Sequence, residues 1–187
     1  MLRDYAFKIS YGPADDRLHD FYIPALERCR SFDRTTGFFS SAALAIAAAG
    51  VVRLIQNGGR MRLLCGADLS SDDVEAIRKG ASLKGTLDTK LTGCLADPTD
   101  QSMRARLEAL AWMVAHGNLE MRVVLPRGPD GHPLPADQAR EYYHPKEGLF
   151  TDEDGNELAF SGSSNDSANG WQWNYEVFSV YASWPLV

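Results

Sequence analysis

The stretch YYHPKEGLFTDEDGNELAFSGSSND, residues 142–166, decides the fold of this part of the chain. Two apolar segments flank DEDGN at 152–156, a turn signal between strands, so we predict a β-hairpin. Side chains alternate between the two faces of a strand, so His144 and Lys146 should point the same way. The returning strand ends in Gly-Ser-Ser-Asn at 162–165, which delivers Asn165 to a strand end.

Strand and helix patterns alternate outward from this hairpin. Strands are expected at 31–39, 60–67, 119–126, about 143–151, 157–162 and about 174–182, and helices at about 17–30, 42–56, 70–79 and 100–116. Pro24 should kink or weaken the first helix. Residues 80–98 are a weakly patterned connector, and 127–137 form a turn-rich loop. This order predicts an α/β sandwich with a central mixed β-sheet.

Length and composition fit one globular domain. The chain has 187 residues, 44% of them apolar, which is enough for one core and too little for two, so 1–187 should be a single domain. The three cysteines lie far apart, which predicts reduced thiols in a cytoplasmic protein. The longest apolar run, SSAALAIAAAGVV, is too short to cross a bilayer and suits a buried helix, so no membrane association is expected.

Charge and ligand types limit the partners. The formal net charge of −6 argues mildly against a nucleic-acid partner but leaves room for a local basic cleft. No Cys/His cluster has zinc spacing, and no acidic cluster suits magnesium. DEDGNE lacks the later ligands of a calcium loop. We therefore expect no metal and no cofactor.

Four side chains form a consistent set for phosphoryl transfer: His144, Lys146, Asn165 and Glu176. An imidazole can attack phosphorus or protonate a leaving oxygen near neutral pH. Lysine and asparagine can stabilise the charge that builds on the non-bridging oxygens. A carboxylate in an apolar strand needs a partner, and an imidazole is a suitable one. The alternative is that these are ordinary exposed strand and turn residues.

Further candidates surround this set. Gly162 and Ser163 could bind phosphate, although Ser163 could instead only shape the turn. Arg140, in a loop, could line a nucleic-acid channel, and Trp173 could either stack on an unpaired base or pack within the protein. Arg127, also in a loop near the site in sequence, has the same alternatives as Arg140, and Trp171 has those of Trp173. Arg122, on a strand, is expected to be structural, and His132 is expected to be an exposed loop residue.

The motifs His144-x-Lys146, Gly162-Ser163-x-Asn165 and Asn174-Tyr-Glu176 resemble the catalytic core of the phospholipase D superfamily, in its nuclease branch. The pattern is similar to phospholipase D-like domains of metal-independent restriction endonucleases. It also resembles modules placed ahead of helicases in bacterial anti-phage proteins. The resemblance is specific from about 142 to 184, and the earlier half fits by element order. It implies a phospholipase D-like α/β/α sandwich, with residues 37–39 in a core strand near the site.

The resemblance also implies a mechanism and an assembly. One histidine attacks the phosphodiester to form a phosphohistidine, and a second one protonates the leaving group. Superfamily members have two His-x-Lys motifs, and this chain has one, so a homodimer should complete the site. Superfamily members usually have an Asp five residues after the Lys, and that position is Thr151 here. The resemblance therefore implies that Glu176 orients the imidazole instead. The chain would be the N-terminal module of a longer protein, with a helicase as partner.

The expected function is thus a metal-independent phosphodiesterase that cleaves DNA in a restriction or anti-phage system. The main alternative is a non-catalytic dimerisation and DNA-docking module that holds a phosphate in the same pocket. A lipid phosphodiesterase is disfavoured because the chain has no basic amphipathic helix or membrane segment. The sequence leaves open whether DNA or RNA is the substrate, and its strandedness.

Overall fold

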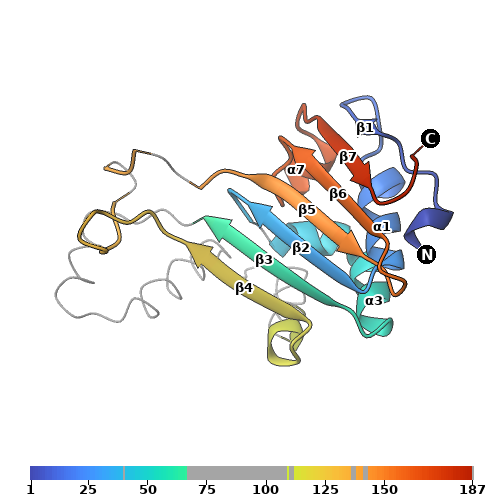
Figure 1. The fold of residues 1–187 in the computed structure, drawn as a ribbon, viewed down its shortest axis with the longest axis horizontal. Coiled ribbons are helices and arrows are strands. Elements are labelled where there is room, and N and C mark those ends of the chain that lie inside the picture. The colour runs from blue at the N-terminus through green and yellow to red at the C-terminus, as the bar shows by residue number, and fades with distance from the viewer. Residues whose placement is uncertain (40, 67–108, 110–111, 136–137, 141–142, 187) are drawn as a thin grey trace, which may run out of the picture.

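The computed structural model describes residues 1–39, 41–66, 109, 112–135, 138–140 and 143–186. Within these residues the centre is a seven-stranded sheet in the order β1-β7-β6-β5-β2-β3-β4 (Figure 1). The strands are β1 (Ser10–Tyr11), β2 (Ser31–Thr36), β3 (Arg60–Gly66), β4 (Leu119–Val124), β5 (Lys146–Thr151), β6 (Glu157–Gly162) and β7 (Phe178–Ala182). Strands β2 to β4 are parallel, and the other pairs are antiparallel. The predicted mixed α/β sheet is confirmed.

The labelled helices lie on one side of the sheet (Figure 1). These labelled helices are α1 (Ile23–Arg28), α3 (Ala48–Gln56) and α7 (Ala168–Gln172), and the chain also forms η1 (Leu2–Asp4), the π-helical turn η2 (Leu18–Tyr22) and α2 (Ser41–Ile46). Residues 112–115 are also helical. The predicted helix 70–79, the connector 80–98 and most of the predicted helix 100–116 lie outside the described residues.

Two predicted helices are each divided in the structure. The predicted helix 17–30 becomes the turn η2 followed by α1, and Pro24 lies in the first turn of α1, where its missing N–H costs nothing. The predicted helix 42–56 becomes α2 and α3, because Ala47 leaves helical geometry (φ −97°, ψ 17°). Tertiary packing thus shortens both helices relative to their apolar periodicity.

Four predicted strands extend beyond the observed ones: 31–39, 119–126, about 143–151 and about 174–182. Strand β2 ends at Thr36, and its last partner on β5 is Lys146. Pro145 has no N–H to extend this ladder. Strand β7 begins at Phe178, opposite Gly162. His144 and Glu176 therefore lie just ahead of strands β5 and β7, and the prediction that they lie within strands is wrong by two residues each.

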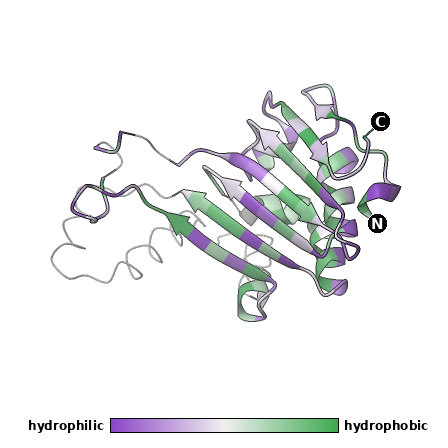
Figure 2. Cartoon of the chain, viewed as in Figure 1, coloured by the Kyte–Doolittle hydropathy of each residue, from purple (hydrophilic) through white to green (hydrophobic). Residues whose placement is uncertain are grey.

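The buried face of the sheet carries an aromatic core. Apolar and polar residues alternate along the strands, as Figure 2 shows by hydropathy. Phe32 and Phe150, on adjacent strands, stack with ring centroids 4.2 Å apart. Phe21 on η2 packs its ring against Phe160 and Phe178. This core fixes the hairpin β5–β6 against the helical layer.

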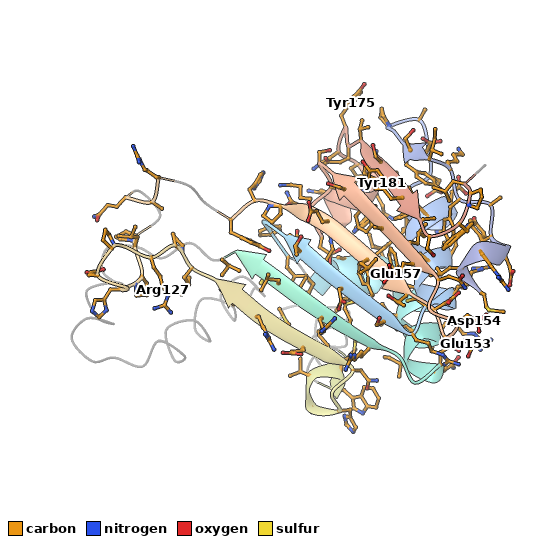
Figure 3. All side chains as sticks on the ribbon, viewed as in Figure 1. Arg127, Glu153, Asp154, Glu157, Tyr175 and Tyr181 are labelled. Atoms are coloured by element: carbon orange, nitrogen blue, oxygen red, sulfur yellow. The ribbon has the colours of Figure 1, made fainter. Side chains whose placement is uncertain are left out.

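The opposite face of the sheet carries charged pairs among the described residues. Arg62 and Asp33 form a bidentate ion pair, and Arg122 pairs with Glu120 at 2.6 Å. Arg122 is thus engaged on this face, as the structural alternative expected. Tyr181 is exposed there too (Figure 3). No helix among the described residues is long and apolar enough to cross a membrane.

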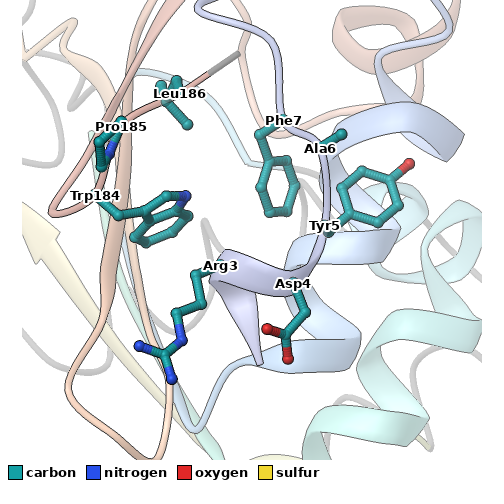
Figure 4. Close-up of a pocket in the computed structure, with 8 residues that line it drawn as sticks. All are labelled: Arg3, Asp4, Tyr5, Ala6, Phe7, Trp184, Pro185 and Leu186. Atoms are coloured by element: carbon teal, nitrogen blue, oxygen red, sulfur yellow. The ribbon is translucent and has the colours of Figure 1, made fainter.

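A pocket lies where the two ends of the chain meet. It is lined by the N-terminal segment and the residues after β7 (Figure 4): Arg3, Asp4, Tyr5, Ala6, Phe7, Trp184, Pro185 and Leu186. None of the predicted site residues lines it. Trp184 and Leu186 pack partly buried against the core, so this pocket belongs to the packing of the chain ends.

Asp152 organises the turn between β5 and β6. Its carboxylate is buried and accepts hydrogen bonds from the backbone N–H groups of Asp154 and Asn156 and from the Asn156 amide. It also accepts from the N–H of Leu2 at 3.0 Å. Burial alone would raise the pKa of Asp152, but these hydrogen bonds lower it below its usual value.

We expect Asp152→Ala to lower the free energy of unfolding by about 1–3 kcal/mol, because several donors lose their acceptor. The lowered pKa means that this stability is fully present above the unfolded-state pKa near 3.8 and is lost as the pH falls below it. Urea unfolding at pH 7 and at pH 3 measures both effects. Asp154→Ala, at the exposed position two residues on (Figure 3), is the control and should change little.

Candidate active site

His144 lies against the loop that leaves β2. Its side chain is exposed, and a methyl group at Gly37 would come within 2.7 Å of His144 Nδ1 and 3.2 Å of its Cα. Only glycine leaves room for the imidazole at this approach. The segment 37–39 therefore lies beside the site as predicted, although it has left strand β2 and keeps only an isolated bridge from Phe39 to Asp166.

Lys146 is buried at the start of β5. Its Nζ donates a hydrogen bond to the carbonyl of His144 at 3.0 Å. Burial lowers the pKa of Lys146, the charge of Glu176 raises it, and the charge of Arg34 lowers it further. Glu147 is exposed on the opposite face, as strand alternation predicted. The Lys146 amine is thus hydrogen-bonded to the backbone of His144, and the charge of Glu176 favours its protonated form.

Glu176 is buried just ahead of β7. Its Oε1 accepts a hydrogen bond from the Asn174 amide at 3.1 Å. The buried guanidinium of Arg17 donates to the carbonyls of Asn174 and Glu176 at 2.9 and 3.0 Å. These contacts fix the main chain on both sides of Tyr175, whose side chain is exposed and projects from the molecule (Figure 3).

The segment 162–166 connects β6 to the helix α7. A methyl group at Gly162 would collide with the carbonyl of Val177, so this glycine permits the close approach of β6 and β7. The Ser163 hydroxyl accepts a hydrogen bond from the N–H of Val177 at 3.0 Å. Both residues therefore shape the turn in this structure, and their contact with phosphate stays a prediction.

Asn165 is partly buried at the end of this segment. Its carbonyl accepts from the N–H of Ser167 at 2.9 Å, while its Oδ1 is buried without a hydrogen-bond partner among the described residues. The neighbouring Ser164 hydroxyl is likewise buried and unpartnered there. A loop that leaves buried polar atoms unmatched has capacity for a further polar group.

Beneath this segment lies a charged network that sequence reasoning missed. Arg34 is 1% exposed and donates from Nη2 to the Ser164 carbonyl at 2.5 Å. Asp166 accepts from the Trp171 indole at 3.0 Å and the Tyr22 hydroxyl at 3.4 Å. Arg34 alternates with Phe32 and Thr36, which are also buried, so its place on a buried strand face was the available signal.

The remaining predicted residues are scattered. Trp171 is buried and stacks on Tyr22 at 4.1 Å, whereas Trp173 is 78% exposed. Arg140 is exposed, and no hydrogen bond or ion pair among the described residues joins it to the site. Arg127 lies on a loop far from the core (Figure 3), where it donates to the Gly131 carbonyl. His132 is exposed in the same loop, as expected.

The strand registers bring the predicted catalytic segments to one end of the sheet. The end of β2 pairs with the start of β5, and the end of β6 pairs with the start of β7. His144 and Lys146 are in contact, and Glu176 acts on Lys146 through its charge. Asn165 follows the end of β6. Within the described residues no group of three His, Cys, Asp or Glu side chains could hold a metal ion.

No protein-family model and no curated protein matches the sequence. Among solved structures, NucT from Helicobacter pylori is similar at 14% identity, with 91% of this chain and 82% of that chain covered and a TM-score of 0.49. Nuc from Salmonella typhimurium, a phospholipase D family member, is similar at 11% identity, with 91% and 79% covered and a TM-score of 0.45.

Yeast tyrosyl-DNA phosphodiesterase, as a mutant, is similar at 9% identity, with a TM-score of 0.47. The match covers 92% of this chain but 30% of that chain, so this chain spans less than a third of that protein. At these identities and TM-scores the likeness says nothing of activity, so a function has to come from the site itself.

We expect Glu176→Gln to lower the pKa of Lys146 further, because the carboxylate that opposes the effect of burial is lost. A lysine-selective NMR titration measures this pKa. Glu147→Gln is the matched control, since Glu147 adjoins Lys146 in sequence but faces the other side of the sheet. Equal shifts in the two variants would contradict a specific coupling between Glu176 and Lys146.

Proposed function

We propose that this chain is a phospholipase D-like phosphodiesterase that cleaves DNA without a metal ion, through a phosphohistidine. One observation carries the proposal. The buried Lys146 amine is hydrogen-bonded to the His144 carbonyl and lies in the field of Glu176, at the point where Gly37 makes room for the imidazole. An exposed imidazole two residues from a buried cation suits attack on a phosphodiester.

In the proposed first step, a ring nitrogen of His144 attacks phosphorus and the bond to the leaving oxygen breaks. A second histidine donates its proton to that oxygen. In the next step this histidine takes a proton from water, the water oxygen attacks phosphorus, and the phosphorus–nitrogen bond breaks. The products are a phosphomonoester and a free hydroxyl, and both imidazoles return to their starting states.

The other site residues have supporting roles in this proposal. The ammonium of Lys146 and the amide of Asn165 stabilise the negative charge on the non-bridging oxygens. Glu176 sustains the positive charge of Lys146 against its burial and orients an imidazole. Gly162 and Ser163 hold the turn that carries Asn165, while Arg140 and Trp173 contact the nucleic acid outside the pocket.

The second histidine comes from a second copy of the chain in this proposal, since the sequence contains one His-x-Lys motif. A two-fold axis would place two His144 side chains about one phosphate, with Lys146 and Asn165 from each copy. We further propose that the module acts with a helicase in a restriction or anti-phage system. The alternative, a docking module without catalysis, shares the pocket and differs in its lack of turnover.

We expect DNA cleavage to persist in EDTA and His144→Ala to reduce it by at least about a thousandfold, the scale on which loss of a nucleophile acts. Gel assays on single- and double-stranded DNA and RNA measure this effect and assign the substrate. His132→Ala, at an exposed loop histidine, is the control and should cleave normally. DNA binding without any cleavage would favour the docking module, and a magnesium requirement would contradict the mechanism.

Mixing the wild-type chain with an equal amount of His144→Ala, after subunit exchange, tests the shared site. Random pairing leaves about one quarter of the dimers with both histidines. Activity per total protein should fall to that fraction of the wild-type value. A fall to only one half would mean that each chain works independently, and the shared site would be wrong.

A further inference from the structure

Arg34 is a fully buried cation that contacts no carboxylate among the described residues. Its Nη2 donates to the Ser164 carbonyl at 2.5 Å, while Nε and Nη1 are buried without any hydrogen-bond partner there. A buried charge is ordinarily paired or fully hydrogen-bonded, because desolvation is otherwise uncompensated. This guanidinium therefore has unused capacity for a negatively charged partner.

The surroundings hold this guanidinium in place. It lies over the ring of Phe160 at 4.9 Å and near that of Trp171 at 5.9 Å. Cation–π contacts of this kind stabilise a desolvated arginine but leave its in-plane N–H donors unused. Arg34 thus connects β2 with β6, α7 and the segment 162–166.

Arg34 belongs to the same end and face of the sheet as the site. It precedes Thr36 by two residues, and Thr36 is the register partner of Lys146. Both side chains are on the buried face, and the charge of Arg34 lowers the pKa of Lys146. The two cations therefore lie close enough to interact at this end of the sheet.

The buried charges at this end do not balance among the described residues. Arg17, Arg34 and Lys146 are opposed by Asp166 and Glu176, and no ion pair within 4.0 Å joins any of them. Asp152, the other buried acid, is in the hairpin turn at the far end of the strands. The surplus is one positive charge, which is the charge that a single phosphodiester neutralises.

We propose that Arg34 is a positioning residue for phosphate binding: it holds the Ser164 carbonyl so that Asn165 meets the phosphate, and it supplies the positive charge that the phosphate balances. This inference rests on the function proposed above and names a residue that the sequence motifs do not include. The Ser164 hydroxyl, which can donate a hydrogen bond, is buried without a partner among the described residues in the same loop.

A purely structural role for Arg34 makes a different prediction. Replacing a buried ionic group by apolar residues of similar volume is often neutral or stabilising for a fold. Removing Arg34 alone would leave Asp166, whose Oδ2 already has no partner among the described residues, without a nearby cation. The double variant Arg34→Met/Asp166→Asn removes both charges and keeps the volume, so folding can be separated from function.

The experiment compares the full chain, this double variant and Arg34→Lys. Inorganic phosphate binding is measured by calorimetry, and hydrolysis of bis-p-nitrophenyl phosphate gives kcat and KM. The double variant should keep its Tm but bind phosphate at least about tenfold more weakly, because the cation that donates to the Ser164 carbonyl is lost while the sum of buried charges stays the same. Arg34→Lys should keep KM, because the charge remains, and lose kcat, because an ammonium lacks the fork that holds the loop.

Arg30→Met/Glu153→Gln removes an exposed ion pair and is the matched control, since it too leaves the net charge unchanged. Unchanged phosphate affinity and kcat in the double variant would overturn the inference, and so would losses that only follow a lower Tm. If the wild-type chain binds phosphate but hydrolyses nothing, the weaker binding of the double variant still supports Arg34 while the catalytic proposal fails. If His144→Ala abolishes hydrolysis and the Arg34 variants do not change it, the catalytic proposal stands and the Arg34 inference fails.

Discussion

The antiparallel pairing of β2 with β5 ends at Thr36 and Lys146, and the rest of the site depends on where this ladder stops. One residue beyond Thr36 is Gly37, which has no side chain to exclude the imidazole of His144. Two residues before Thr36 on the same face is Arg34. A shift of the register by one residue would turn one of these two cations out of the buried face. The aromatic core, above all the stack of Phe32 on Phe150, opposes that shift.

The sequence predicted the parts of the fold that depend on local pattern. The hairpin follows from alternation around DEDGN, and strand β6 has the predicted bounds. The ends of the strands could not be predicted, because they depend on where a neighbour stops pairing, as Pro145 illustrates. The break at Ala47 also lacks a local signal, since alanine favours a continuous helix.

The residues of the candidate site also fall into those that a sequence pattern predicts and those that depend on tertiary contacts. His144 and Lys146 could be found because their spacing matches the period of a strand. Arg34 and Asp166 could not be assigned to the site from the sequence, because their roles depend on contacts between segments about 130 residues apart. The two tryptophans beside Gln172 show the same limit: Trp171 lies in the core and Trp173 in solvent, and their sequence context is nearly identical. An acidic chain can thus bury a local surplus of positive charge that its overall composition conceals.

Arg17 and Arg34 hold the two site loops by their main chains: their hydrogen bonds go to the carbonyls of Gly12, Asn174, Glu176 and Ser164. A carbonyl is present whatever the side chain, so these anchors do not depend on the identity of the residues that they hold. Side chains at 164 and 174 can therefore be exchanged while the loops keep their paths. This arrangement separates the scaffold from the chemistry, and it offers a route by which such a site can acquire new substrates through evolution or engineering.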